Sequence, residues 1–368
     1  MPTPQRLLYP DLLRVIAMLA VVALHVAGYE LLDVRVGSRD MHWMNILDGA
    51  TRWCVPIYVM VSGMFLLRPS AAADDLRAAY RKTLRGALRL LSILVIWSVL
   101  YGIFTMVLGN QPVTVASTAQ WLVEMWFNPT WYHLWFLYML VPLYFLSPLV
   151  RLFLHRTEPR HADWLVLVLV VGGPVTTFVL TLLGALTGQG LYRMMPEYTG
   201  YLCYFVLGWW LAHREHSARQ RLGIHVAGLA GIAFTIIATA MASTAQGKFT
   251  TAFYAYPLVT TAATAAAVFV AAKQWGGAHE PSAGQRQVIT ALGAATLGIY
   301  LVHPALLAIV MRGFRAAGWT MANGPLPTPV LLVLVTVVVF AGSLLFALVV
   351  RAVLQRLPRG RDWVGWVI

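Results

Sequence analysis

Two residues that could do chemistry lie in the first apolar stretch of the chain, "LLRVIAMLAVVALHVAG" at residues 12–28. Arg14 and His25 are eleven residues apart, which in an α-helix places both side chains on one face, about 16 Å apart along the axis. Asp11 precedes Arg14 by three residues, close enough on a helix to pair with it. An imidazole can act as a base or nucleophile near neutral pH, and a guanidinium keeps its charge when partly buried. We therefore expect a catalytic His25 and an anion-binding Arg14 that Asp11 orients.

Further polar residues occur at a comparable predicted depth in two other apolar stretches. "WYHLWFLYMLVPLYFLSP" contains His133 and Trp135, and "LGIYLVHPAL" places Tyr300 and His303 on one face of a helix. Ionisable groups are costly inside a bilayer and are tolerated mainly where they face a cavity or a partner. We expect the three histidines to converge, with these four residues shaping the acceptor side of a site or stabilising an oxyanion. Simple packing of each residue, and snorkelling of Arg14 to the membrane interface, are the alternatives.

The composition indicates which elements must position these residues. Hydrophobic residues make up 59% of the chain, charged residues only 11%, and the mean hydropathy is +0.70, whereas charged residues alone reach roughly a quarter of a soluble domain. The sequence predicts an all-α, polytopic membrane protein, with no connection long enough for a soluble domain, so that residues 1–368 form one membrane-embedded domain. Stretches near the spanning length of about 20 residues predict ten transmembrane helices, at roughly 10–30, 50–68, 84–108, 132–154, 164–187, 198–213, 222–243, 252–272, 289–311 and 328–354.

The positive charges predict the orientation of these helices. The formal net charge is +13, and most Lys and Arg residues fall in the alternate connections that share a side with the N-terminus, which predicts that both termini are cytoplasmic. The connection at 69–83 is then cytoplasmic and the one at 109–130 is outside. The basic residues form short clusters between apolar stretches rather than one basic face, which argues against a nucleic-acid partner.

Several simpler classes of protein and site are disfavoured. Arg14 interrupts the first apolar stretch early and no small-residue cleavage site follows, so we expect a retained helix rather than a signal peptide. Cys54 and Cys203 lie near predicted outer ends of helices, where a disulfide is conceivable, although two free core thiols are favoured. The chain lacks a P-loop, a Rossmann glycine pattern and metal-ligand spacing, so we expect no metal.

Four motifs, in this order, resemble the acyltransferase 3 family of integral membrane O-acyltransferases. They are the pair Arg14 and His25, "VPIYVMVSGMFLL", "HLWFLYMLVPLY" and "LGIYLVHP", and the resemblance covers essentially the whole chain. It implies transfer of an acyl group, most often acetyl, from cytoplasmic acyl-CoA to a hydroxyl of a sugar or glycan. It also implies a multi-pass protein of the bacterial cytoplasmic membrane that modifies a lipid-linked or cell-surface polysaccharide unit, with acetyl-CoA as co-substrate.

Within this resemblance the roles of the residues can be narrowed but not fully separated. His25 would act either as a base for direct transfer or through an acyl-imidazole, and Arg14 with Asp11 would bind the donor. Arg81, Lys82 and Arg85, in "RAAYRKTLRGALR", are candidates for the CoA phosphates, although ordinary positive-inside topology explains them as well. The competing hypothesis is a transporter of a small solute or lipid-linked sugar. Such carriers often contain repeated halves, and residues 1–187 and 188–368 show no convincing repeat.

Overall fold

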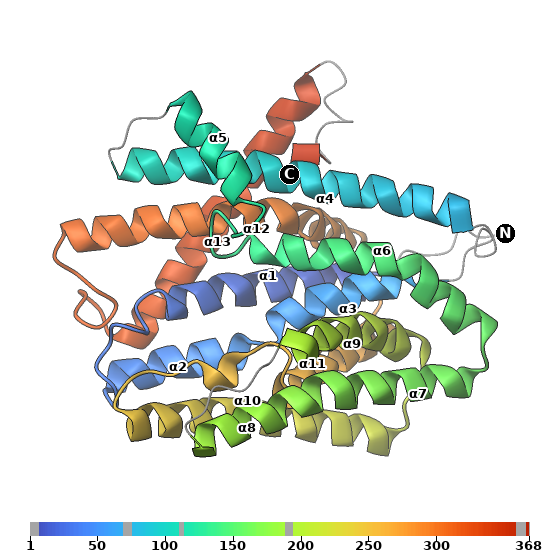
Figure 1. The fold of residues 1–368 in the computed structure, drawn as a ribbon. Coiled ribbons are helices and arrows are strands. Elements are labelled where there is room, and N and C mark those ends of the chain that lie inside the picture. Colours follow the sequence, from blue (N-terminus) through green and yellow to red (C-terminus); the bar gives the residue numbers. More distant parts are fainter. Residues whose placement is uncertain (1–6, 69–75, 110–113, 188–193, 358–365, 368) are drawn as a thin grey trace.

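A computed structural model describes residues 7–68, 76–109, 114–187, 194–357 and 366–367, and these residues form a bundle of helices (Figure 1). The termini, residues 69–75 of the predicted cytoplasmic connection and residues 110–113 of the predicted outer connection lie outside the described residues. The helices are α1 Tyr9–Gly28, α2 Arg39–Thr51, α3 Cys54–Leu66, α4 Leu76–Leu108, α5 Val115–Glu124, α6 Trp135–Arg156, α7 Pro159–Val170, the π-helical turn η1 Val171–Val175, α8 Thr176–Thr187, α9 Met194–His213, α10 Ala218–Gln246, the 3-10 turn η2 Ala252–Tyr254, α11 Val259–Ala278, α12 Ala283–Ala316 and α13 Thr328–Arg356.

The prediction of an all-α, polytopic membrane protein is confirmed. In the described part of the chain, eight helical segments are long and apolar enough to cross a membrane, and they lie at Tyr9–Gly28, Arg77–Leu108, Trp135–Arg156, Pro159–Thr187, Ala218–Gln246, Ala252–Ala278, Ala283–Ala316 and Thr328–Arg356. The two predicted stretches that are not among these are 50–68 and 198–213, where α3 and α9 lie. With 13 residues, α3 alone is about 20 Å long, short of the roughly 30 Å of a hydrocarbon core.

A separate helix that was not predicted, α2, precedes α3 and begins at Arg39. Figure 1 shows α2 and α3 lying end to end, with Arg52 and Trp53 at the break between them. The sequence window excluded α2 because its polar residues lower its mean apolarity, yet Asn45 and Asp48 are buried. The Arg52 side chain lies inside the bundle, where it pairs with Asp48.

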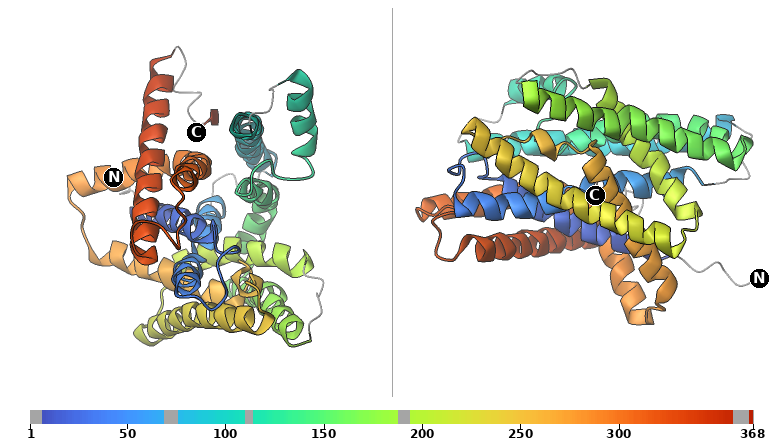
Figure 2. Two further views of the ribbon diagram at one scale, coloured as in Figure 1. Left: turned by 90° about the vertical axis from the view of Figure 1, so that its left-hand side faces the viewer. Right: turned by 90° about the horizontal axis from the view of Figure 1, so that it is seen from below.

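The first helix, α1, lies at the centre of the bundle and packs against α2, α3, α11, α12 and α13. Figure 2, in its left panel, looks roughly along several helix axes and shows α1 enclosed by its neighbours. The backbone of α9 approaches α3 closely at Gly63, because a Cβ atom there would lie 1.8 Å from the Phe205 carbonyl oxygen. Cys54 and Cys203 are both buried and free, as the sequence favoured.

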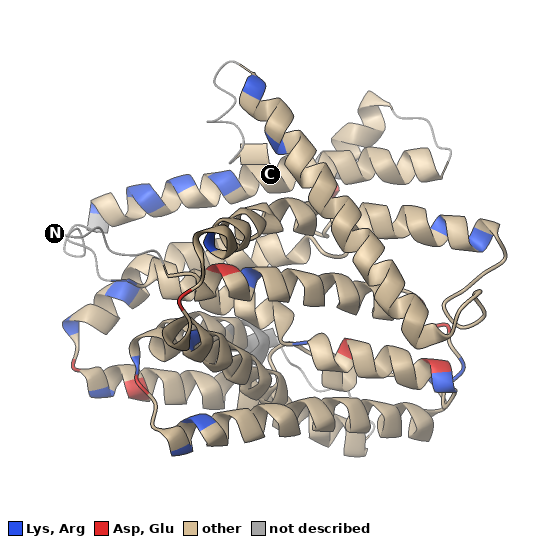
Figure 3. Cartoon of the chain, turned by 180° about the vertical axis from the view of Figure 1, so that it is seen from behind, with Lys and Arg blue, Asp and Glu red and all other residues tan. Residues whose placement is uncertain are grey.

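The Lys and Arg residues lie mainly towards the two ends of the bundle. Figure 3 shows Lys and Arg concentrated towards the end of the bundle at which the N-terminus lies, with a smaller group at the opposite end. Such a bias is what the positive-inside rule expects of a cytoplasmic N-terminus. The orientation of both termini stays a prediction.

Candidate active site

A cavity of about 180 Å³ lies inside the bundle, and Arg14 and His25 both line it. The prediction that these two side chains share one face of the first helix is thus confirmed. The other walls come from α3, α4, α6, α12 and the segment before α11, and include Tyr58, Ser62, Leu90, His133, Trp135, Phe136, Tyr256, Thr296 and Tyr300. The wall is mostly apolar with a few polar groups, as in many small-molecule sites.

His25 forms a hydrogen-bonded pair with His303 of α12. The two nearest ring nitrogens, His25 Nδ1 and His303 Nε2, are 2.8 Å apart, and His303 Nδ1 lies 3.1 Å from the Ile299 carbonyl oxygen. A carbonyl oxygen only accepts, so the network assigns the proton of a neutral His303 to Nδ1. His303 Nε2 then accepts from the Nδ1–H of His25. This leaves His25 Nε2 with its lone pair, which is the form that a base or nucleophile requires.

The helices fix this pair from opposite sides. His25 lies in the last turn of α1 and is half-buried where it meets the cavity, whereas His303 is fully buried in α12. The two rings are close to parallel, with an angle of 15° between their planes. The more enclosed histidine therefore orients the one that faces the cavity, a role that sequence spacing could not assign.

His133 completes the predicted convergence of three histidines. It lies just before α6, and its ring packs 5.8 Å from the His303 ring, 5.1 Å from Tyr300 and 5.0 Å from Tyr101, between ring centroids. Neither ring nitrogen of His133 has a hydrogen-bond partner among the described residues. The Tyr300 hydroxyl donates to the His133 backbone carbonyl oxygen at 2.5 Å, so in this arrangement Tyr300 ties α12 to the start of α6.

Arg14 lies on the same face of α1 as His25, towards the other end of the helix. Its Nη1 atom donates to Asp11 Oδ1 at 3.1 Å, as predicted, and its guanidinium lies 5.2 Å from the centroid of the Phe65 ring. The Arg14 side chain is 32% exposed and that of Asp11 only 3%. Gly293 of α12 makes room for Asp11, since a Cβ atom there would lie 3.0 Å from the Asp11 Cβ atom. Asp11 thus holds a cation that still faces open space.

The predicted basic cluster on α4 is not brought to Arg14. Arg81, Lys82 and Arg85 are exposed, and none of them lines the cavity. Two other arginines lie nearer. Arg89 and Arg14 both interact electrostatically with Tyr144 of α6, and the Arg68 guanidinium lies 4.5 Å from the same Phe65 ring that Arg14 contacts.

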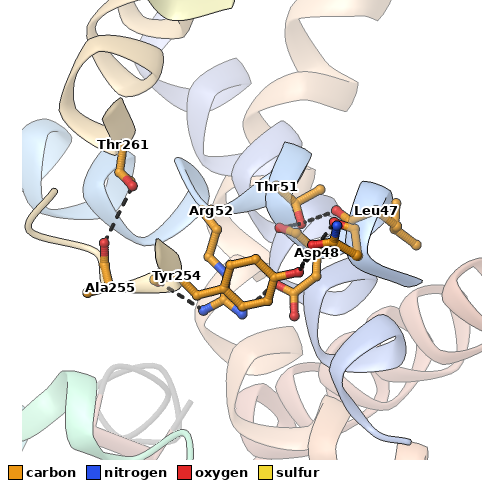
Figure 4. Close-up of polar contacts among 8 residues, drawn as sticks. Leu47, Asp48, Thr51, Arg52, Tyr254, Ala255 and Thr261 are labelled. Atoms are coloured by element: carbon orange, nitrogen blue, oxygen red, sulfur yellow. Dashed lines mark hydrogen bonds and ion pairs between the residues drawn. The ribbon is translucent and has the colours of Figure 1, made fainter. Parts of the chain in front are cut away.

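A second ion pair, which sequence reasoning missed, lies deeper in the bundle. Arg52 pairs with Asp48 one helical turn earlier, and Figure 4 shows the Arg52 side chain between Asp48 and Tyr254. Its Nη1 atom donates to the Tyr254 carbonyl oxygen at 3.3 Å, and its guanidinium lies 4.1 Å from the centroid of the Tyr254 ring. The Asp-x-x-x-Arg spacing at the edge of an apolar stretch was the signal that could have found it.

The comparisons with known proteins decide the family. The acyltransferase 3 family profile, described as an acyltransferase domain, matches residues 7–348, which is nearly the whole chain. The chain belongs to the acyltransferase 3 family. No curated protein and no solved structure matches it. Membership implies an enzyme that uses an acyl donor, and the bundle places this acyltransferase in a membrane.

Proposed function

We propose that this acyltransferase moves an acetyl group from cytoplasmic acetyl-CoA to a hydroxyl of a sugar or glycan. The acceptor is a lipid-linked or cell-surface polysaccharide unit at the bacterial cytoplasmic membrane. The observation that carries the proposal is the cavity that joins Arg14 to His25, because it links an anion-binding cation to an oriented imidazole. On α1 the two are about 16 Å apart along the helix axis, room for an extended thioester arm between them.

The donor would enter past Arg14. Its phosphates would meet the guanidinium of Arg14, which Asp11 holds in place, with Arg68 and Arg89 as the nearest further cations. The exposed Arg81, Lys82 and Arg85 would contribute longer-range attraction for an anionic donor at the membrane surface. The thioester carbonyl would then reach His25.

His25 Nε2 can serve either of two routes. In direct transfer, Nε2 takes the proton of the acceptor hydroxyl as its oxygen attacks the thioester carbonyl, and the collapsing intermediate releases the CoA thiolate, which takes that proton back. In the covalent route, Nε2 attacks the carbonyl and the CoA thiolate leaves. The hydroxyl oxygen then attacks the acyl group, the imidazole leaves as the neutral base, and the hydroxyl proton passes to the CoA thiolate. Rapid acid quench with labelled acetyl-CoA and no acceptor separates them, because only the covalent route leaves label on His25.

His303 would act as a positioning residue in either route. Substitution His303→Ala removes the acceptor for the His25 Nδ1–H, whereas His303→Gln offers an amide oxygen in its place. We expect His303→Ala to lower kcat with little change in the KM for acetyl-CoA, and His303→Gln to recover part of the loss. A purely structural role would instead lower the thermal stability of both variants, without a selective loss of kcat in His303→Ala and its partial recovery in His303→Gln.

The experiment that tests the proposed function uses the purified protein in liposomes. Labelled acetyl-CoA is supplied on one side, with membrane glycan extract as acceptor, and the label on the glycan is measured beside the passage of labelled sugar across the membrane. Acetylated glycan without sugar transport supports the proposal. Sugar transport without any acetylated product contradicts it and favours the carrier hypothesis.

A further inference from the structure

A second cavity, of about 420 Å³, adjoins the one that Arg14 and His25 line, and four of its nine lining residues are aromatic. Arg52 lies in its wall, and the rest of the lining comes from Trp135, Tyr201 and the segment 251–257, which includes Tyr254 and Tyr256. Trp135 and Tyr256 also line the catalytic cavity. Their rings stack, with centroids 5.6 Å apart and 25° between the planes. These two side chains therefore form the partition between the two cavities.

The charge in this second cavity is balanced. Asp48, only 2% exposed, neutralises Arg52, and the guanidinium lies over the rings of Tyr254 and Tyr256 at 4.1 and 5.6 Å from their centroids. The Arg52 side chain is 16% exposed. The wall thus offers aromatic faces and one partly exposed guanidinium, with no net charge.

This combination fits a neutral sugar ring better than an ion. An anionic ligand would meet the Asp48 carboxylate as well as Arg52, and a cationic ligand would be repelled by the guanidinium. A sugar presents an apolar C–H face that packs on an aromatic ring and hydroxyl groups that accept a hydrogen bond from a partly exposed guanidinium such as that of Arg52. An apolar chain would form no hydrogen bond with it.

The second cavity also lies close to the three histidines. Trp135 follows His133 by two residues, and the ring of His133 packs against that of His303, the partner of His25. The Trp135 ring also lies 5.7 Å from that of Tyr201 on α9, between centroids. A ligand on Trp135 and Tyr201 would thus lie beside the Trp135–Tyr256 stack that lines both cavities.

We propose that the aromatic cavity around Arg52 binds the acceptor as a neutral sugar ring, and that the Trp135–Tyr256 stack is the partition across which its hydroxyl reaches His25. This inference rests on the proposed function for the identity of the reaction, but not for the binding itself. It assigns Arg52, Tyr201, Tyr254 and Tyr256 to acceptor binding and leaves Arg14 to the donor.

The test blocks the cavity at Ala255, a small residue in its wall that Figure 4 shows on the segment beside Tyr254. Ala255→Cys is modified with a maleimide in a chain whose native cysteines, Cys54 and Cys203, are buried. Ala322→Cys, in the wall of a separate cavity beside Glu30 and Asp33, is the matched control. We expect modified Ala255→Cys to lose transfer to glycan while CoA still stabilises it, and modified Ala322→Cys to retain transfer. Transfer at the wild-type rate after modification of Ala255→Cys overturns the inference.

A second readout does not depend on acyl transfer. The rate of maleimide labelling of Ala255→Cys is measured with methyl glucoside, methyl galactoside or N-acetylglucosamine, and with tetraethylene glycol as a non-sugar control. Slower labelling with a sugar but not with the glycol supports the site even if the wild type transfers no acetyl group, in which case only the proposed function fails. If the wild type transfers no acetyl group and no sugar slows the labelling, both fail.

A milder variant pair addresses the ring contact. Tyr201→Phe keeps the aromatic face, whereas Tyr201→Ala removes it, and one aromatic contact changes an affinity by about two- to tenfold. We expect Tyr201→Ala to raise the KM for glycan by that factor at unchanged KM for acetyl-CoA, and Tyr201→Phe to resemble the wild type. Equal KM values for glycan in all three proteins contradict the proposed stacking.

Discussion

In the described part of the chain, two Asp–Arg pairs each lie within one helical turn, and their surroundings differ. Arg14, paired with Asp11, lines the cavity that also contains His25, and its side chain is 32% exposed. Asp48 and Arg52 lie where α2 meets α3, and the Arg52 side chain is 16% exposed and covered by Tyr254 and Tyr256. The carboxylates are equally buried, at 3% and 2%. The two pairs therefore differ in how far the arginine side chain is exposed.

The difference indicates what each arginine can do. Among the described residues, Arg14 pairs with Asp11 and contacts the Phe65 ring, and its side chain is 32% exposed, as a ligand-binding cation requires. Arg52 links α2 to the segment before α11 through Asp48 and the Tyr254 carbonyl. The same two residue types thus form a binding group in one place and a fixed, neutral wall in the other.

The largest effect is expected when the enclosed pair is broken. Arg52→Ala leaves the Asp48 carboxylate buried without its cation, which typically costs about 3–5 kcal/mol. We expect a large loss of folded protein and of thermal stability, measured by size-exclusion profile and melting temperature in detergent. The double variant Asp48→Leu/Arg52→Met removes both charges and should recover much of the loss. A melting temperature of Arg52→Ala equal to that of the wild type would show that the pair is not enclosed.

The exposed pair should respond in the opposite way. Arg14→Ala removes a cation that is partly exposed, so we expect the fold to survive and donor binding to fail. A ligand at 100 times its Kd stabilises a protein by about 2.7 kcal/mol, and we expect this CoA-induced shift in melting temperature to be largely lost. Arg14→Lys, which keeps a point charge, should retain part of it. An unchanged CoA shift in Arg14→Ala removes Arg14 from the donor site.

A smaller effect is expected from the carboxylate beside Arg14. Asp11→Asn frees the Arg14 charge for an anionic ligand but loosens its orientation, and these effects oppose each other. Partly exposed pairs contribute about 0–1 kcal/mol, so we expect the Kd for CoA to change by less than about fivefold. Asp48→Asn, which leaves a buried guanidinium unpaired, should lower the melting temperature more. Calorimetric titration and melting curves on both variants check the contrast, and a reversed order of stability contradicts it.

The sidedness of the protein in the membrane can be tested without a change in its stability or activity. If the Arg14 end of the molecule is cytoplasmic, Glu158→Cys should label from that side and Thr251→Cys, in the wall of the Arg52 cavity, from the other. Both positions are exposed, and the native cysteines are buried and should react slowly. Labelling of intact cells and of inverted membrane vesicles with an impermeant maleimide tests this. Labelling of both positions from the same side of the membrane would contradict the predicted topology.

Much of the site could be predicted from the sequence because helical spacing fixes which residues share a face. The shared cavity of Arg14 and His25 follows from their spacing, and the convergence of His133 and His303 on His25 follows from the cost of polar groups in a membrane. Which of the three histidines pair with each other, and through which ring nitrogens, could not be predicted. The pairing of His25 Nδ1 with His303 and of His303 with Ile299 depends on how α1 packs against α12.

The pair at Asp48 and Arg52 could not be found from apolar windows for a related reason. A window scores each residue by its own polarity, whereas the polar groups of α2 are satisfied by partners far along the chain. The Asn45 amide donates to the Ile236 carbonyl oxygen at 2.9 Å, and Tyr254 donates to Asn45 Oδ1 at 2.5 Å. Only the tertiary fold reveals these partners, so apolar windows did not indicate that Asp48 and Arg52 lie inside the bundle.

If His25 performs acyl transfer, the variant His25→Gln should lose this activity while the protein still binds CoA. A glutamine keeps much of the shape and a hydrogen bond to His303 but cannot take a proton or carry the acyl group. The measurement is transfer of labelled acetyl from acetyl-CoA to membrane glycan, beside CoA-induced thermal stabilisation of the same preparation. A catalytic base contributes about 10²–10⁴-fold to a rate, so we expect transfer to fall by at least that lower factor while CoA stabilisation persists. Transfer by His25→Gln above about a tenth of the wild-type rate, short of the smallest typical loss of a base, would contradict the account.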